Sequence, residues 1–123
     1  MEASFDNAAV GFGTGGATSR ATASFAVGGT NRVLYAMVGT GAGTPVIPSS
    51  VTWNGGAEAF TQIGTTISHT NGRHTLWRLI NPSAVTATVV ANWGTSQDEQ
   101  LVVGISFKDA DQGTPNGTVA QQA

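Results

Sequence analysis

The stretch NGRHTLWRLINPSAVTATVVANW, residues 71–93, predicts the fold class of this chain. It opens on Asn-Gly, a pair preferred in two-residue hairpin turns because both residues tolerate positive φ. An apolar run follows over 73–80, and after Asn-Pro-Ser a second run over 84–93 alternates Val, Ala and Trp with Thr and Asn. We expect the two runs to form the central hairpin of an all-β core. The residues expected to face inward from the second run are Val85, Ala87, Val89, Ala91 and Trp93.

Shorter strand-like runs lie on both sides of this stretch, separated by turn residues. Further strands are expected over 4–10, 19–27, 32–39, 51–53, 57–63, 65–70 and 101–107, with turns at 28–31 and 54–56 and a Gly/Pro/Ser loop over 40–50. No run of ten residues has helical periodicity. The pattern therefore predicts a two-sheet antiparallel β-sandwich of eight to nine strands, with jelly-roll or immunoglobulin-like topology.

Alternation within two of these runs predicts which side chains face the core. The inward positions expected from it are Ala21, Ala23, Phe25 and Val27 in one strand, and Leu101, Val103, Ile105 and Phe107 in the other. The polar residues 94–100 are expected to form a loop before the last long strand.

The two ends of the chain are expected to be less regular than its middle. The glycine-rich run 11–16 is followed by no helical pattern, so we interpret it as a flexible loop and not as a dinucleotide-binding motif. The sequence predicts a single domain over 1–123, with a flexible N-terminal segment 1–18 and a C-terminal tail 112–123. Residues 118–123 are a candidate for a final edge strand.

The composition excludes several classes of function. Charged residues make up 10% of the chain, against about 25% in an average soluble domain. A net charge of -2 with five scattered Lys and Arg residues gives no basic patch for nucleic acid. No apolar run approaches the roughly 20 residues that a membrane span requires. The first residues have neither the basic nor the apolar part of a signal peptide, so we expect no secretory export.

A histidine pair is the sharpest candidate for a metal site. A two-residue loop at Asn71-Gly72 would place His69 opposite His74, with Cβ atoms about 5 Å apart. A zinc site needs four ligands in all, and no Cys, Asp or Glu lies near these two in the sequence. We therefore predict two polar surface residues, and neither a metal nor a cofactor.

The other chemical candidates also favour structural roles. Asp98 and Glu99 are neighbours on a strand and point to opposite faces, so they cannot act as an acid/base pair. Asp109 and Asp111 are expected to cap their own turn, because further calcium ligands are missing. No catalytic residue is predicted.

The three tryptophans offer a binding hypothesis beside a packing one. If they were exposed, Trp53, Trp77 and Trp93 could stack on sugar rings, as exposed tryptophans do in carbohydrate-binding modules. Each falls in phase with apolar neighbours, so we expect at least two of them to pack in the core.

Four segments together resemble a known module. They are 31–34 (NRVL), 51–56 (VTWNGG), 76–82 (LWRLINP) and 106–115 (SFKDADQGTP). In this order they resemble a β-sandwich module of bacteriophage structural proteins, such as capsid decoration (cement) proteins, and of bacterial surface proteins. The resemblance covers residues 19–117 and brings no catalytic residues with it.

The resemblance implies a virion protein without enzymatic activity, made in the host cytoplasm and bound to the capsid surface. Its expected partners are the major capsid protein and further copies of itself, as a homotrimer. The interface residues expected are Thr44, Pro45, Val46, Ile47 and Pro48 in the long loop, together with Phe5 and Phe12. The alternative is a carbohydrate-binding or host-adhesion module of a tail fibre or a bacterial surface protein, with a glycan as ligand.

Overall fold

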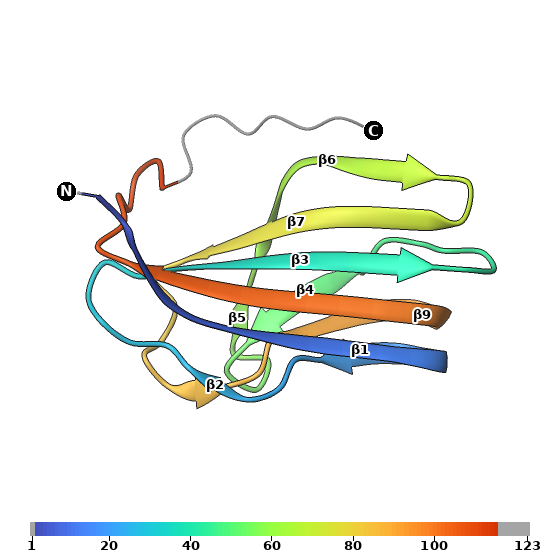
Figure 1. Cartoon of the computed structure of the whole chain (residues 1–123), viewed down its shortest axis with the longest axis horizontal. Coiled ribbons are helices and arrows are strands. Elements are labelled where there is room, and N and C mark those ends of the chain that lie inside the picture. Colours follow the sequence, from blue (N-terminus) through green and yellow to red (C-terminus); the bar gives the residue numbers. More distant parts are fainter. Residues whose placement is uncertain (1, 116–123) are drawn as a thin grey trace.

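The computed structural model describes residues 2–115, and within them it contains only strands, turns and loops (Figure 1). The nine strands are β1 (Ser4–Ala21), β2 (Phe25–Ala26), β3 (Val33–Gly41), β4 (Ser50–Trp53), β5 (Glu58–Ala59), β6 (Thr61–His69), β7 (Gly72–Ile80), β8 (Thr86–Ala87) and β9 (Val90–Lys108). The predictions of an all-β fold and of eight to nine strands are confirmed for this part of the chain. No helix in it is long and apolar enough to cross a membrane.

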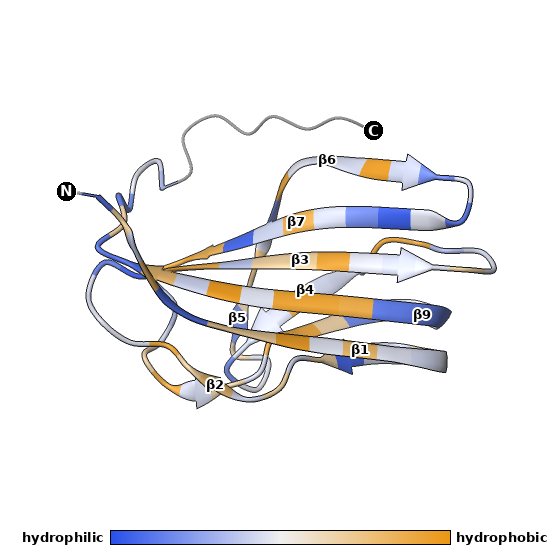
Figure 2. Ribbon diagram, in the orientation of Figure 1, coloured by the Kyte–Doolittle hydropathy of each residue, from blue (hydrophilic) through white to orange (hydrophobic). Residues whose placement is uncertain are grey.

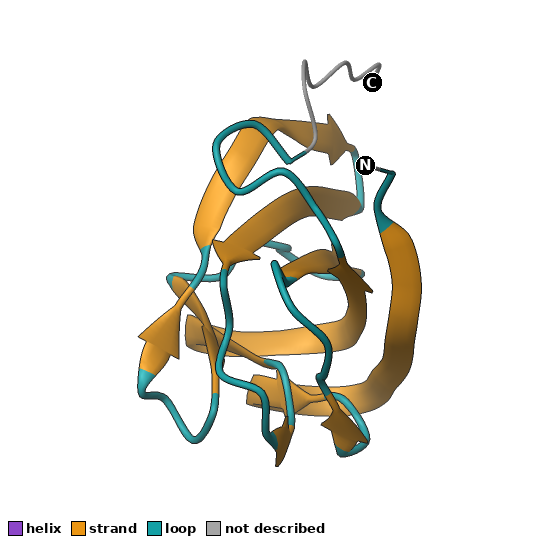
Figure 3. Ribbon diagram, turned by 90° about the vertical axis from the view of Figure 1, so that its left-hand side faces the viewer, coloured by secondary structure: helices purple, strands orange, loops and turns teal. Residues whose placement is uncertain are grey.

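Seven strands form one antiparallel sheet, and β2 and β8 form a second, small one. In the large sheet the order is β5-β4-β9-β3-β7-β6, and β1 also pairs with β9. The sheet is curled, as the view turned by 90° shows (Figure 3). β3 is a central strand, paired along both edges by β7 and by β9.

The curl of the large sheet depends on two long strands, β1 and β9, which stay paired along its curve. β1 and β9 pair from Ser4↔Lys108 to Ala21↔Val90, with register shifts on either side of Ala17. Gly15 and Gly16 adopt φ of 86° and 83° just before this point. Such angles cost glycine no steric strain, so the strand can bend here and continue.

Two sequence predictions are therefore wrong. The glycine-rich run 11–16, and most of the N-terminal segment 1–18 expected to be flexible, lie inside β1. The polar residues 94–100 form no loop, because they belong to β9. Neighbouring strands satisfy the backbone of both segments, which the polarity of their side chains does not reveal. Residues 116–123, with most of the predicted C-terminal tail and its candidate strand, lie outside the described residues.

The expected central hairpin within 71–93 is also corrected. β7 pairs with β3 and β6, whereas residues 90–92 of β9 pair with β4 and β1. Asn81 has a φ of 53° and Pro82 is buried, so the Asn-Pro-Ser connection redirects the chain instead of folding it back. The hairpin actually formed is the one between β6 and β7, residues 61–80.

The core lies inside the curl and includes all three tryptophans. Trp53, Trp77 and Trp93 are 0%, 7% and 4% exposed, which confirms the packing prediction and removes all three as sugar-stacking platforms. Each indole N–H donates a hydrogen bond, to the Ser83 carbonyl, the Thr75 hydroxyl and the Thr40 hydroxyl respectively. These bonds allow the large rings to be buried without an unpaired donor.

Several local predictions are confirmed. The turn at 54–56 uses positive φ at all three residues, and the turn at 28–31 uses it at Gly29 and Asn31.

The inward positions predicted over 21–27 are only partly right. Phe25 and Val27 are buried as expected, but Ala21 and Ala23 are exposed and Thr22 is buried instead. The Thr22 hydroxyl accepts a hydrogen bond from the Val89 N–H at 3.0 Å, which offsets the cost of burying it.

Candidate functional site

The second half of β9, residues 100–108, presents its larger apolar side chains away from the core. Within residues 100–107 the buried positions are Gln100, Val102, Gly104 and Ser106, so the prediction that Leu101, Val103, Ile105 and Phe107 face inward is wrong. The interior has no room for them. A Cβ at Gly104 would lie 2.9 Å from the side chain of Val89 and 3.0 Å from that of Phe25.

These outward residues continue across the sheet as rows of neighbours. Residues paired across strands point to the same side. One row runs Val10–Val103–Met37–Leu76, another Ala8–Ile105–Tyr35–Arg78, and a third Phe5–Phe107–Val33–Ile80. We call this side of β1, β9, β3 and β7 the outer face; hydrophobic residues are frequent along these strands (Figure 2).

The outer face exposes large apolar side chains. Phe12 is 64% exposed, Phe5 62%, Val10 54% and Met37 46%. Phe5 also stacks edge-on against Phe107, with ring centroids 6.4 Å apart, and Phe107 does the same with Tyr35 at 6.0 Å. Scattered single apolar residues are normal on a protein surface, whereas a contiguous apolar patch marks a contact surface.

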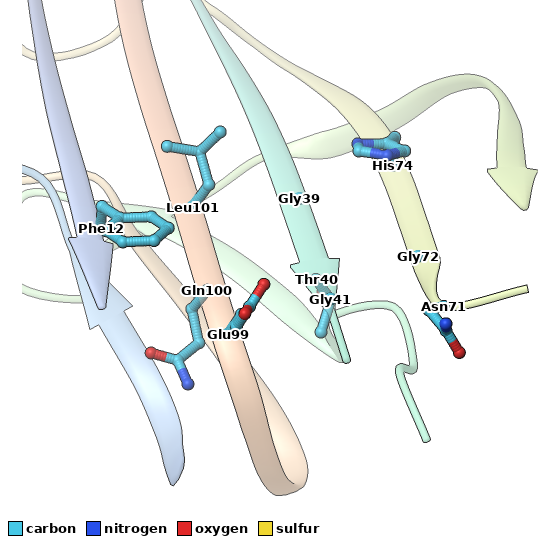
Figure 4. Close-up of a pocket in the computed structure, with 10 residues that line it drawn as sticks. All are labelled: Phe12, Gly39, Thr40, Gly41, Asn71, Gly72, His74, Glu99, Gln100 and Leu101. Carbon is cyan, nitrogen blue, oxygen red and sulfur yellow. The ribbon is translucent and has the colours of Figure 1, made fainter. Parts of the chain in front are cut away.

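A shallow cavity of about 240 Å³ hollows one end of this face (Figure 4). We call it the trough. It is lined by Phe12, Gly39, Thr40, Gly41, Asn71, Gly72, His74, Glu99, Gln100 and Leu101. It is hollow because β3 and β7 carry glycines where other positions carry side chains. Gly41 pairs with both Gly72 and Glu99.

Three polar side chains stand at the rim of the trough without an intramolecular hydrogen bond or ion pair in the described part of the chain: Glu99, Asn71 and His74. A Cβ at Gly41 would lie 3.0 Å from a carboxylate oxygen of Glu99. A Cβ at Gly39 would lie 3.4 Å from Nδ1 of His74. The Glu99 carboxylate therefore lies over Gly41 and the His74 imidazole over Gly39, and these two glycines form the bottom of the trough.

The two histidines lie together, but in a different register from the one expected. The turn consists of Thr70 and Asn71, so His69 pairs with Gly72, and His74 pairs with Ile67. The two rings still meet edge to face, with centroids 5.7 Å apart. Among residues 2–115 no group of three or more His, Cys, Asp or Glu side chains is placed to hold a metal ion.

The predicted interface residues separate into two groups. Phe5 and Phe12 lie at opposite ends of the outer face. In the long loop Thr44, Val46 and Ile47 are exposed, but Pro45 and Pro48 are buried and cannot contact a partner directly. The loop is held by hydrogen bonds from the Val46 N–H to Gln97 Oε1 at 3.0 Å and from the Ser49 N–H to the Asn92 carbonyl at 2.8 Å.

One ionisable group in the middle of the outer face is perturbed. Burial raises the pKa of Tyr35 above its ordinary value, and the nearby Arg78 guanidinium opposes part of that rise. The phenol therefore stays neutral, and it places a hydroxyl beside the Arg78 guanidinium among the apolar residues of this face.

Comparison with known proteins adds no constraint. No protein-family model, curated protein or solved structure matches this chain. The candidate site rests on its geometry alone. The sequence indicated Phe5 and Phe12 and predicted the strand over 101–107, but the side of that strand was wrong: the alternating apolar residues 101–107 were assigned to the core and lie instead on the outer face.

Proposed function

We propose that this chain is a virion structural protein without enzymatic activity, which binds and stabilises an assembled capsid lattice as an oligomer. Its partners are the major capsid protein and further copies of itself, and its location is the capsid surface. The observation that carries the proposal is the outer face, where exposed phenylalanines and aliphatic side chains cover four adjacent strands. Such a surface is stabilised when another protein covers it.

The low charge of the chain supports the same function. A protein whose surface is occupied by neighbours needs few Lys and Glu side chains, which are depleted at interface cores. Binding the assembled lattice, and not free subunits, would stabilise the lattice by mass action.

We further propose that the fold is a two-sheet sandwich of jelly-roll or immunoglobulin-like topology. The curl of the large sheet and the separate β2–β8 pair support it. One cluster of buried residues, with Leu34 and Trp77 from β3 and β7 and Val51 and Trp93 from β4 and β9, would then be the layer between the two halves of the curled sheet, which Phe25 of the small sheet joins.

The experiment mixes the purified chain with undecorated phage heads and measures binding and the temperature at which the heads break. Binding with a higher disruption temperature is the expected result. The loop double variant Val46→Asp with Ile47→Asp should bind more weakly, because both side chains are exposed in a predicted contact loop. Val85→Asp is the matched control, since Val85 is 37% exposed and Ile47 38%. If the wild-type chain neither binds nor protects heads, the proposal is wrong.

A glycan-binding or host-adhesion module is the second candidate, and the trough favours it. The phenyl ring of Phe12 provides an apolar wall, and Glu99, Asn71 and His74 offer both donors and acceptors, as sugar hydroxyls require. A glycan array tests this idea. A signal that Phe12→Ala and Glu99→Gln both abolish would favour it over capsid binding.

A further inference from the structure

The outer face has a projection at one end and a hollow at the other. Phe5 projects from the end where it pairs with Phe107. The trough lies at the other end, beside Glu99. Phe107 and Glu99 are eight residues apart on β9, which corresponds to about 26 Å along an extended strand.

Two copies of such a face complement each other. A two-fold axis makes an isologous interface, in which residue i contacts residue j while j contacts i. A two-fold axis in the plane of contact can place Phe5 of the second copy over the trough of the first copy. The same rotation places Phe5 of the first copy over the trough of the second. We propose that a second copy of this chain covers the outer face in a two-fold dimer, with Phe5 of each copy seated in the trough of the other.

The trough has the size and lining that a phenyl ring needs. Its volume is about 240 Å³, and an apolar cavity of about 150 Å³ is enough to hold benzene. Phe12 and Leu101 form an apolar side of the trough, next to Gly39 and Gly41 (Figure 4). The Phe5 ring of the second copy would meet the Phe12 ring there, in a contact of the kind that already joins Phe5 to Phe107 within one chain.

The area of the face matches what a stable dimer requires. If a large apolar side chain counts for about 200 Å², the exposed residues Phe5, Val10, Phe12, Met37 and Ile80 present roughly 500 Å², to which the half-buried apolar residues of the outer face add. A standard interface buries about 800 Å² from each partner. The rim groups Glu99, Asn71 and His74 would lie at the edge of the contact, where polar residues are normal.

This inference deepens the proposed function, because it assigns the self-association that the function requires to one surface. A sheet face stacks against one other sheet face about 10 Å away. The outer face therefore builds a dimer and not the homotrimer that the resemblance implies. The tests below use the purified chain without heads, so they succeed or fail independently of capsid binding.

The first test is the mass of the full chain in solution, measured by size-exclusion chromatography with light scattering over a concentration series. The expected species is a dimer of the 12.5 kDa chain. Val10→Asp and Phe12→Asp should each weaken dimerisation at least tenfold, and Val85→Asp should not. Circular dichroism checks that each variant is folded. A wild-type chain that stays monomeric at 100 μM, or a dimer that the two outer-face variants leave intact, would overturn the proposal.

The second test fixes the orientation by disulfide trapping, which is clean because the chain has no cysteine. A variant with both Phe5→Cys and Asn71→Cys should form a covalent dimer under mild oxidation, and so should a mixture of the two single variants. Within one chain these positions are too far apart, because a disulfide needs Cα atoms within about 7 Å. Each single variant alone, and Phe5→Cys combined with Val85→Cys, should stay unlinked. Equal trapping of the control pair would refute the seating of Phe5 in the trough.

Discussion

The guanidinium of Arg20 donates two hydrogen bonds to Oε1 of Gln100, from Nε at 3.1 Å and from Nη2 at 2.8 Å. Gln100 is fully buried, and its amide nitrogen donates to the carbonyl of Gln97. The Gln97 side chain in turn accepts from the backbone of Val46. This chain of bonds joins β1, β9 and the long loop at one end of the molecule.

Gln100→Ala should therefore destabilise the protein by about 3 kcal/mol, because hydrogen bonds to a charged group are lost and buried polar groups are left unpaired. Urea unfolding followed by tryptophan fluorescence measures the loss. Glu99→Ala is the matched control on the adjacent residue, which is exposed, and it should change stability by less than about 0.5 kcal/mol. Equal effects of the two substitutions would show that the Gln100 bonds contribute nothing specific.

Gly11→Ala should be among the most damaging substitutions of a small residue in the chain. A Cβ there would lie 1.9 Å from the carbonyl oxygen of Ala21, and backbone on both sides has little freedom to move. We expect a loss of about 3 kcal/mol or failure to fold. Gly94→Ala, where a Cβ meets nothing within 4 Å, should be neutral or stabilise by up to about 1 kcal/mol. Thermal unfolding of the two variants side by side distinguishes these outcomes.

Asp111 should titrate below the usual range of an aspartate. Its Oδ1 accepts backbone N–H bonds from Gly113 at 2.8 Å and Thr114 at 3.2 Å, and these bonds lower the pKa of the carboxyl. Because the folded pKa is the lower one, the stabilisation of this turn is present above about pH 4, the unfolded pKa. It is lost as pH falls through the folded value.

Carboxyl chemical shifts recorded by NMR across a pH series measure that pKa directly. Asp111→Asn should keep the turn and remove its pH dependence, because an amide oxygen still accepts both bonds but does not titrate. Asp111→Ala should speed amide exchange at Gly113 above the folded pKa of Asp111, where the wild-type carboxylate accepts both bonds. A carboxyl that titrates at its ordinary value would contradict the hydrogen-bonded turn.

Local chemistry could be predicted from the sequence because it depends on neighbours in the chain. The turns at 28–31 and 54–56 follow from Gly and Asn, which tolerate positive φ. The self-capped turn at Asp111 follows from the reach of its own carboxylate. The burial of the tryptophans follows from their size and their apolar neighbours. Phe5 and Phe12 were identified as interface candidates, although not as the two ends of one surface.

The all-β character of this protein and its turns at 28–31 and 54–56 could thus be predicted from the sequence alone, through periodicity and turn chemistry. Only the tertiary structure decided which strands pair and which side of β9 faces the core. Positions 100–107 alternate between two sets, and periodicity cannot say which set is buried. The decision depends on distant residues: Phe25 and Val89 leave no space beside Gly104, and Arg20 and Asp6 satisfy Gln100 and Ser106. The larger apolar set was therefore left on the outer face, where the proposed interface lies.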